Sequence, residues 1–492
     1  MESYLIGIDN GLTATKAVLY DLRGTEVGSA SLPTKLVSSQ SGFSEIDLQQ
    51  QWETCCIVIK QVLEKTSVPL TAIVAIGVSA YGNGLHLLDQ KGQPLGKAIT
   101  SMDHRALHLV ETFPEDRRRQ LHALTLQNIW DGQPGMIAGW IKEHQPERYH
   151  QIGTILFCKD WIQSCLTGHL STEYTDISAA GLMNNHTKAY DQAILELIGI
   201  PEMLSCLPVV IKSSQVAGAV TPEAAAQTGL ISGIPVVGGM FDVTANSIGS
   251  GLIRQGQFCT IAGTWNINIA LGQHPLIPQH IRQCTIYGDE QLYSYIDSSA
   301  TSASNLEWFL HNVLNRSCSY DEFEHIIAQY QPSDVDLIFL PLVNGGLRND
   351  NPGALFYGLK NYHGRNEMLR AIAEGIGFAH DYHIQNLLKE GVQKGDTLLF
   401  TGGASKNRRW CQMFADIMQM TVKVPESEQT GALGDCIMAG VGAGVFADLH
   451  EAITRMVRIG EVYEPNPAYA ARYQKKYERF VELLEKMSAL KN

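Results

Sequence analysis

Two stretches far apart in the chain carry residue types that suit the binding of phosphate groups. One is LIGIDNGLTATKAVLYDLRG at Leu5–Gly24, and the other is QFCTIAGTWNINIALG at Gln257–Gly272. Each predicts a strand, a tight turn with glycine and threonine, and a second strand. Backbone N–H groups and small hydroxyls of such a turn can hydrogen-bond phosphate oxygens without a bulky side chain nearby. Because the turn occurs twice, we predict a duplicated domain that closes on one polyphosphate, which indicates an enzyme that uses ATP.

An acidic residue, Asp9, ends the first predicted strand and directly precedes the turn Gly11–Thr15. A carboxylate beside phosphate is unfavourable unless a cation lies between them, and Mg²⁺ prefers one or two carboxylates together with phosphate oxygens. We therefore expect Asp9 to hold Mg²⁺, the alternative being an Asp that only caps the turn. Lys16 follows closely enough to reach a transferring phosphoryl group, or else it is a solvated lysine at the strand end.

A second acidic residue, Asp242, lies where an apolar strand ends and a helix rich in small residues begins, in GGMFDVTANSIGSG. A helix N-terminus favours an ionised carboxylate, so N-capping alone could explain an Asp here. The preceding Gly238 and Gly239, however, would let a ligand or another segment approach the backbone. We therefore predict Asp242 to be the base that takes the proton of a hydroxyl group as its oxygen attacks the γ-phosphorus of ATP.

A third glycine-rich turn, Thr401–Asn407, joins a predicted strand to a predicted helix, and its two glycines permit close backbone approach. The turn lacks the pattern GxxxxGK[ST] and the spacing of GxGxxG, which argues against P-loop and Rossmann folds. We interpret the run Gly440–Gly444 as helix packing and C-capping. His380 and His383 are interpreted as ordinary helix residues, because no third metal ligand accompanies them.

The elements that must position these residues alternate between strand and helix, which is typical of an α/β protein. Ala72–Ser79 is an apolar run of strand length that ends in the polar turn AYGNG, and ligands bind at such carboxyl ends of strands. With 492 residues the chain is too long for one ordinary core. A helix followed by a Gly-Pro turn at Thr221–Ile234 predicts a division into residues 1–235 and 236–492.

Composition excludes several kinds of partner. The formal net charge of −13 leaves no basic surplus for a nucleic-acid backbone, whereas the charge of ATP can be met locally. The 10 Cys include no CxxC pair and no zinc spacing, which favours a reducing compartment. No apolar run approaches the roughly 18 residues of a membrane span, and the first strand begins by Tyr4. We therefore expect no signal peptide, no membrane partner and a cytoplasmic location.

Taken in order, these segments resemble the FGGY family of carbohydrate kinases over nearly the whole chain. The resemblance implies an α/β fold of two duplicated ribonuclease-H/actin-like domains that flank a catalytic cleft. The matching segments are the two phosphate loops DNGLTATK and IAGTWN, the adenosine segment TGGASKNRRWCQMFAD, the C-terminal signature GALFYGLKNYHGRNEMLRAIAEGIGFAH, and KDWIQSCLTG with TEYTDIS, which is similar to the KDYLxxxLTG of sugar kinases.

The resemblance also implies roles for particular residues, with ATP and Mg²⁺ as cofactors. Asp242 is implied to be the base, and Asp9 and Asp242 the carboxylates at the metal. The residues expected around ATP are Asp9, Gly11, Thr13, Thr15, Lys16, Gly263, Thr264, Gly402, Gly403 and Asn407. The residues expected around the sugar are Tyr81, Gly82, Asn83, Asp103, Arg105 and Asp242. For Asp103 and Arg105, which match the family's Asp-x-Arg, the alternative is an ion pair exposed at the rim.

The substrate implied by the resemblance is a keto-sugar. D-xylulose kinases tend to have SAQMHG where this chain has SAYGNG, so Asn83 replaces a sugar-contacting His, and the Arg-Glu pair of glycerol kinases is absent. The runs SAYGNGLHLLD, KEHQPERYHQIG, CLTG and NLEWF are most similar to kinases of L-xylulose and 3-keto-L-gulonate. The resemblance therefore implies phosphorylation of L-xylulose, 3-keto-L-gulonate or another pentulose. The alternatives are a polyol kinase of the erythritol or glycerol type and an actin-like ATPase without a sugar substrate. Homodimers are common among such kinases.

Overall fold

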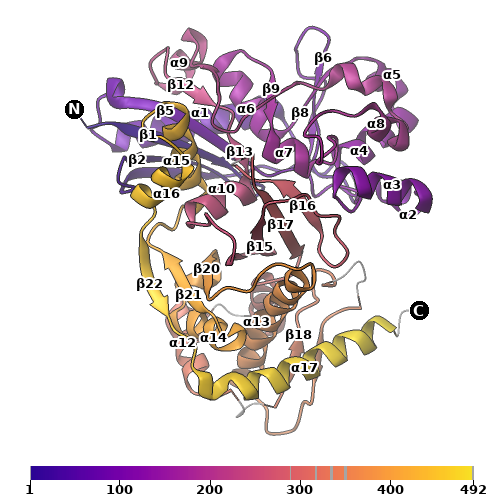
Figure 1. The fold of residues 1–492 in the computed structure, drawn as a ribbon, viewed down its shortest axis with the longest axis vertical. Coiled ribbons are helices and arrows are strands. Elements are labelled where there is room, and N and C mark those ends of the chain that lie inside the picture. Colours follow the sequence, from indigo (N-terminus) through magenta and orange to yellow (C-terminus); the bar gives the residue numbers. More distant parts are fainter. Residues whose placement is uncertain (1, 289, 316–317, 333–335, 348–351, 490–492) are drawn as a thin grey trace.

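Two twisted sheets of seven strands each form the cores of two lobes, one above the other in Figure 1. The computed structural model describes residues 2–288, 290–315, 318–332, 336–347 and 352–489. The first sheet has the strand order β11-β12-β5-β1-β2-β3, and β13 also pairs with β5. Its strands are β1 (Tyr4–Asn10), β2 (Ala14–Asp21), β3 (Glu26–Pro33), β5 (Ile73–Ala80), β11 (Val216–Ala219), β12 (Pro235–Val237) and β13 (Met240–Phe241).

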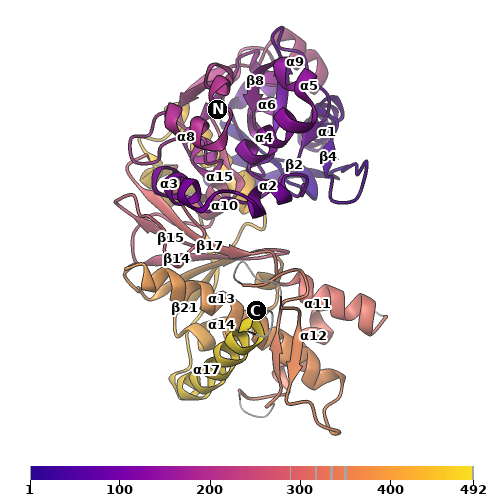
Figure 2. The ribbon, with the colours of Figure 1, turned by 90° about the vertical axis from the view of Figure 1, so that its right-hand side faces the viewer.

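The second sheet has the order β16-β17-β15-β14-β20-β21-β22. Figure 2 shows it between the first lobe and the helices α13 and α14 of the second. Its strands are β14 (Gln257–Ala262), β15 (Asn266–Gly272), β16 (Gln283–Ile286), β17 (Tyr293–Ser299), β20 (Thr397–Thr401), β21 (Thr421–Pro425) and β22 (Ile459–Tyr463). Short two-stranded sheets add β4 (Glu45–Ile46), β6 (His86–Asp89), β7 (Ala98–Ile99), β8 (Ile152–Leu156), β9 (Ser171–Glu173), β10 (Val209–Ile211), β18 (Ile338–Leu340) and β19 (Leu355–Tyr357).

The two sheets repeat one topology. In the first, β1, β2 and β3 form an antiparallel meander, and β5 and then β12 continue the sheet parallel to β1. In the second, β14, β15 and β17 form the meander, and β20 and then β21 continue parallel to β14. Both predicted hairpins are therefore present, and the duplicated α/β fold expected from the sequence is confirmed.

Helices cover the faces of both sheets. Helix α1 shows why they form: the Asp47 side chain caps its N-terminus, and Trp52, Cys55 and Ile59 recur on one face and are buried against the first sheet. The helices of the first lobe are α1 (Leu48–Lys65), α2 (Leu107–Glu111), α3 (Glu115–Thr125), α4 (Pro134–His144), α5 (Pro146–His150), α6 (Cys158–Thr167), α7 (Tyr174–Ala179), α8 (Gln192–Ile198) and α9 (Pro222–Thr228). Those of the second lobe are α11 (Ser304–Trp308), α12 (Tyr320–Ala328), α13 (Arg365–Lys389), α14 (Arg408–Met418) and α17 (Pro467–Ala489).

Three further helices join the lobes: α10 (Asp242–Gly249), α15 (Thr430–Gly442) and α16 (Leu449–Met456). One apolar cluster combines residues of α10 and α15 with buried residues from strands of both sheets. Helix α15 lies directly on β1 and β5, because glycines remove the side chains that would separate them. A Cβ on Gly77 of β5 would lie 2.1 Å from the Asp435 carbonyl oxygen. The C-terminal part of the chain thus returns to the first lobe.

The predicted division at residues 235/236 falls inside β12, whose Val236 pairs with Ile76 of β5. The first sheet therefore includes residues on both sides of that position, and the division stays a prediction of the sequence. Within the part of the chain that the structure describes, no helix combines the length and the apolarity that crossing a bilayer needs.

Candidate active site

Asp9 and Lys16 face each other across the first hairpin. They are register partners in β1 and β2, so their side chains lie on the same face of the sheet. Burial raises the pKa of the Asp9 carboxyl, and the Lys16 ammonium lowers it in part. Thr15, the partner of Asn10, is buried on the opposite face of the hairpin. Its side chain is therefore turned away from Asp9.

Asp242 begins helix α10, directly after the short strand β13. Burial raises the pKa of its carboxyl to about 8, and the negative charge of Asp9 adds to the effect. The two carboxylates, from strands that flank β5 on either side, therefore lie close enough to repel each other. A third carboxyl, Asp435 of α15, is fully buried and accepts a hydrogen bond of 2.8 Å from Ser79 Oγ. Burial, Asp9 and Asp242 raise the pKa of Asp435 well above its ordinary value.

The N-terminus of α15 connects these acids to the second lobe. A Cβ on Gly431 would lie 3.0 Å from Asp9 Oδ2, so this glycine leaves room for the carboxylate. The neighbouring Thr430 hydroxyl donates to Asn246 Oδ1 of α10 at 2.8 Å and lies 3.2 Å from the Thr401 hydroxyl at the end of β20. Asn246 in turn donates to the carbonyl oxygen of Asp242 at 2.9 Å. The helix of the predicted base is thus hydrogen-bonded, through two hydroxyls, to the turn Gly402–Gly403.

The two glycine turns of the second lobe lie against each other. Gly402 has a φ of +95°, and a Cβ there would lie 2.7 Å from the Ala262 carbonyl at the end of β14. Only glycine accepts both this backbone conformation and this approach. The next turn residues, Gly263 and the exposed Thr264, are held through their carbonyl oxygens by Ala303 N and Ser304 Oγ.

Asn407, which the sequence analysis places around ATP, is fully buried. Its side chain caps α14 by accepting from Trp410 N at 2.9 Å. In the first hairpin, Gly11 N donates to Ala14 O at 2.9 Å and Thr13 is exposed at the turn. In the turns around Gly11 and Gly263, the backbone and the side chains of Thr13 and Thr264 are therefore accessible to a ligand. The side chains of Thr15 and Asn407 are buried within the fold.

The segment Tyr81–Asn83 lies beside Asp242. A Cβ on Gly82 would lie 2.5 Å from the ring of Phe241, the residue before the predicted base. Asn83 Oδ1 is buried and has no hydrogen-bond partner among the described residues, whereas the buried Tyr81 hydroxyl interacts with the side chains of Gln51 and Cys158. Asn83 also has a φ of +62°, a backbone conformation that Asn tolerates better than most side chains do. Buried polar atoms without partners are rare, and a bound hydroxyl group or water is one reason for them.

Asp103 and Arg105 form an ion pair, as the alternative interpretation expected, but the pair is buried and not exposed at a rim. Arg105 Nε donates to Asp103 Oδ1 at 2.8 Å, and Arg105 Nη2 donates to Glu45 Oε1 at 2.8 Å. The guanidinium also lies 4.1 Å from the centre of the Phe43 ring. Asp103 Oδ2 accepts from Ser44 N at 2.7 Å. This arrangement holds the segment after β7 against the chain before α1.

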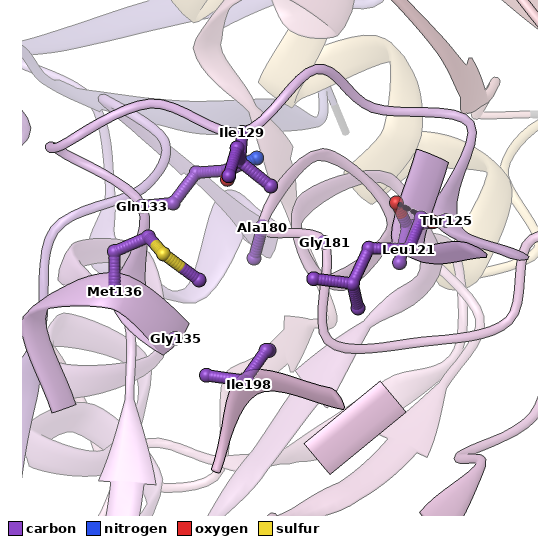
Figure 3. Close-up of a pocket in the computed structure, with 9 residues that line it drawn as sticks. All are labelled: Leu121, Thr125, Ile129, Gln133, Gly135, Met136, Ala180, Gly181 and Ile198. Atoms are coloured by element: carbon purple, nitrogen blue, oxygen red, sulfur yellow. Dashed lines mark hydrogen bonds between the residues drawn. The ribbon is translucent and has the colours of Figure 1, made fainter. Parts of the chain in front are cut away.

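Two hollows of the surface lie away from these residues. The pocket in Figure 3 is lined mainly by apolar residues of α3, α4, α8 and the segment after α7, with Thr125 and Gln133 as polar side chains. Its volume of about 10 Å³ holds no more than one water molecule. A groove of about 550 Å³ lies between the β2–β3 hairpin and the chain around residues 426–429. Neither is lined by a residue predicted for ATP or sugar.

Sequence reasoning missed Asp435 and the polar residues under the Tyr81 turn. Gln51 Nε2 donates to Cys158 Sγ at 3.0 Å, and Gln51 Oε1 lies 3.1 Å from His86 Nε2. Burial lowers the pKa of His86 to about 3. A lone Asp in the Gly- and Ala-rich run GALGDCIMAG is a signal that could have identified Asp435. His380 and His383 are buried and hydrogen-bonded to side chains of the second sheet, as helix residues, and no group of metal ligands occurs in the described ranges.

Two sheets of one topology, with carboxylates and glycine turns between them, are typical of an actin-like α/β fold. The N-terminal and C-terminal domains of the FGGY family of carbohydrate kinases match residues 4–249 and 259–443. The chain belongs to this family and is therefore a sugar kinase that uses ATP and phosphorylates an alcohol group. This assignment decides against an ATPase without a sugar substrate.

Relatives and solved structures match over the whole chain. A probable L-xylulose kinase of Pasteurella multocida is 38% identical to this chain, and the match covers 100% of that protein and 99% of this chain. The L-xylulose/3-keto-L-gulonate kinase of Escherichia coli is 35% identical and is covered to 97%, with 98% of this chain. The crystal structure of a ligand-bound xylulose kinase from Lactobacillus acidophilus has a TM-score of 0.91 at 26% identity, with 99% of both chains covered.

Proposed function

We propose that this kinase transfers the γ-phosphoryl group of ATP to a hydroxyl of L-xylulose or 3-keto-L-gulonate, with Asp242 as the base. The observation that carries the chemistry is the position of Asp242 at the start of α10, within electrostatic reach of Asp9 and beside the Tyr81–Asn83 turn. A carboxylate there can accept the proton of the attacking hydroxyl. The substrate class rests on the two L-xylulose kinases that are 35% and 38% identical over the full length.

The donor set of the site fits Mg²⁺ with a nucleotide. Burial is the main cause of the raised pKa of both carboxyls; the charge of Asp9 raises that of Asp242 further, whereas Lys16 lowers that of Asp9. A cation beside the two carboxylates would stabilise their ionised forms. Mg²⁺ takes one or two carboxylates and keeps waters and phosphate oxygens as its other ligands. Asp9 and Asp242 would hold it. When bound, it supplies positive charge to the phosphate oxygens during transfer.

The chain's own groups perform the remaining tasks. Lys16, opposite Asp9, would reach the transferring phosphoryl group. The N–H groups of Gly11 and Gly263 donate within their own turns, so other backbone N–H groups of these turns would bind phosphate. Gly402 and Gly403 would border the rest of the nucleotide. The Tyr81 hydroxyl and Asn83 Oδ1 would hydrogen-bond sugar hydroxyls, and Asp242 would hold the proton that the attacking oxygen loses.

Turnover of ATP on a panel of acceptors tests the substrate class. The panel is L-xylulose, 3-keto-L-gulonate, D-xylulose, D-ribulose, erythritol and glycerol. We expect the highest kcat/KM on L-xylulose or 3-keto-L-gulonate. A higher value on erythritol or glycerol would establish a polyol kinase instead.

A further inference from the structure

We propose that Glu173 is a positioning residue that holds the turn carrying Asp242, acting through the hydroxyls of Thr175 and Ser213. The inference rests on the proposed role of Asp242 as the base. It concerns a residue of the first lobe that lies at the end of β9 and caps the N-terminus of α7.

The Glu173 carboxylate is fully buried, and four hydrogen bonds saturate it. Oε1 accepts from Thr175 Oγ1 at 2.7 Å and from Asp176 N at 2.9 Å. Oε2 accepts from Thr175 N at 2.7 Å and from Ser213 Oγ at 2.7 Å. A cap of α7 needs only the two backbone donors. The two hydroxyl donors therefore point to a second task.

The Thr175 hydroxyl connects Glu173 to the residue before the base. Because Thr175 Oγ1 gives its hydrogen to Glu173, its lone pairs are free to accept from Phe241 N, at 2.8 Å. Phe241 is the last residue of β13 and directly precedes Asp242. The direction of the hydroxyl, and with it the position of this backbone amide, is thus set by Glu173.

The Ser213 arm holds the other end of the same short strand. Its hydroxyl donates to Glu173, and its carbonyl oxygen accepts from Gly239 N at 3.1 Å. Gly239 has a φ of +76°, and a Cβ there would lie 2.1 Å from the Val78 carbonyl oxygen. The backbone is therefore confined between Ser213 and β5. One carboxylate fixes the chain on both sides of β13.

Lys159 supplies positive charge that Glu173 shares with Asp160, the nearest partner of the lysine, and with Asp176. Its ammonium is fully buried and lies 3.8 Å from Glu173 Oε1. A Cβ on Gly239 would lie 3.1 Å from Lys159 Cδ, so the lysine chain also lies under the turn. A buried carboxylate with four donors and a cation is held in one orientation. This suits a group that must align a base, because a displacement of about 1 Å can lower the rate about 10²-fold.

The test compares Thr175→Val, Thr175→Ser and Ser213→Ala in the full-length kinase. Thr228→Val is the matched control, since that buried hydroxyl donates to Ala224 O at 2.7 Å and accepts from Leu230 N, on α9 away from Asp242. We expect Thr175→Val to lower kcat on the order of 10- to 100-fold while KM for ATP changes less than about twofold. Thr175→Ser keeps the hydroxyl, so its kcat should stay within about threefold of the wild-type value. Ser213→Ala should lower kcat in the same direction, and Thr228→Val should leave it unchanged.

Hydrogen exchange at the Phe241 amide gives a readout independent of catalysis. Exchange should become faster in Thr175→Val but not in Thr175→Ser or Thr228→Val. Unchanged kcat in both Thr175→Val and Ser213→Ala, with Asp242→Asn inactive, would overturn the role of Glu173 and leave the base in place. If Asp242→Asn keeps its turnover, the proposed base is wrong and the positioning role is overturned with it. If Thr175→Val does not fold, kcat and hydrogen exchange at the Phe241 amide are compared between Ser213→Ala and Thr175→Ser. A lower kcat and faster exchange in Ser213→Ala alone would support the positioning role, and no difference between the two variants would overturn it.

Discussion

At the scale of single residues, the pKa of Asp242 determines how the rate depends on pH. A base must be ionised to accept a proton, and burial with the charge of Asp9 raises its pKa to about 8. We expect kcat/KM for the sugar to rise tenfold per pH unit below the pKa and to level off above it. Because a cation at Asp9 stabilises the ionised form, the midpoint with Mg²⁺ and ATP present should lie below about 8. A rate independent of pH between 5.5 and 8.5, with chemistry rate-limiting, would contradict the assignment.

Asp435 makes a prediction about stability. Its pKa is raised in the folded protein, so the folded state holds a proton that the unfolded chain releases once pH exceeds its ordinary value. Stability is therefore lost as pH rises from the unfolded pKa toward the folded one. Asp435→Asn removes this pH-dependent loss of stability. We expect it to raise Tm at pH 7.5 by about 2–4 °C or more, because a change of about 1 kcal/mol in the free energy of unfolding shifts Tm by that amount in domains of this size. The gain should shrink toward pH 4.5. The same Tm difference between Asp435→Asn and the wild type at pH 7.5 and at pH 4.5 would count against a raised pKa of Asp435.

Asp103 makes a contrasting prediction, because its partner is a buried cation. Asp103→Ala removes three hydrogen bonds that Arg105 donates, two from the guanidinium and one from the backbone N–H, and leaves Glu45 as the carboxylate partner of the guanidinium. Removing one partner of a buried pair typically costs about 3–5 kcal/mol. Chemical denaturation should show a loss of that order in the free energy of unfolding. If the segment with Asp103 and Arg105 lines the sugar site, KM for the sugar should also rise. A loss below about 1 kcal/mol would show that the pair contributes little.

At the scale of elements, glycines set how closely α10 and α15 approach. A Cβ on Gly434 would lie 2.0 Å from the Ala245 carbonyl oxygen, which cannot move without moving α10. Gly434→Ala should therefore displace the helix of Asp242, lower stability by about 1–3 kcal/mol and lower kcat. Gly139→Ala in α4 is the control, because its nearest atom would be Leu109 Cδ1 at 3.7 Å. Alanine should stabilise that helix slightly. Equal effects of the two substitutions would disprove the packing argument.

Local signals explain which features the sequence predicted. The hairpins depend on residues next to one another, and Asp9 and Asp242 end apolar strands at glycines, so both were predictable. Thr15 was predicted to lie around ATP from its place in the turn. The strand register that turns its side chain away from Asp9 depends on the length of the turn, which local residue types do not reveal. Glu173 accepts hydrogen bonds from residues 175, 176 and 213, and Thr175 in turn accepts from residue 241, a set that only the folded chain brings together.

At the scale of the molecule, the candidate site draws on both lobes. Asp9 and Lys16 belong to the first sheet, whereas Gly263 and Gly402 lie in turns next to strands of the second. Because transfer to water competes with transfer to a sugar, we expect the lobes to close once the sugar binds. Small-angle scattering with sugar and a non-hydrolysable ATP analogue should show a smaller radius of gyration than the free protein. An unchanged radius with both ligands bound would count against closure.

The central claim is that this kinase phosphorylates a keto-sugar with Asp242 as the base, and one measurement tests it most directly. ATP turnover with L-xylulose, and without it, should be compared between the wild type and Asp242→Asn, together with the affinity of each for ATP. We expect sugar-stimulated turnover in the wild type, and in Asp242→Asn an unchanged ATP affinity with turnover lowered by at least about 10²-fold. Sugar-stimulated turnover that persists in Asp242→Asn would contradict the account.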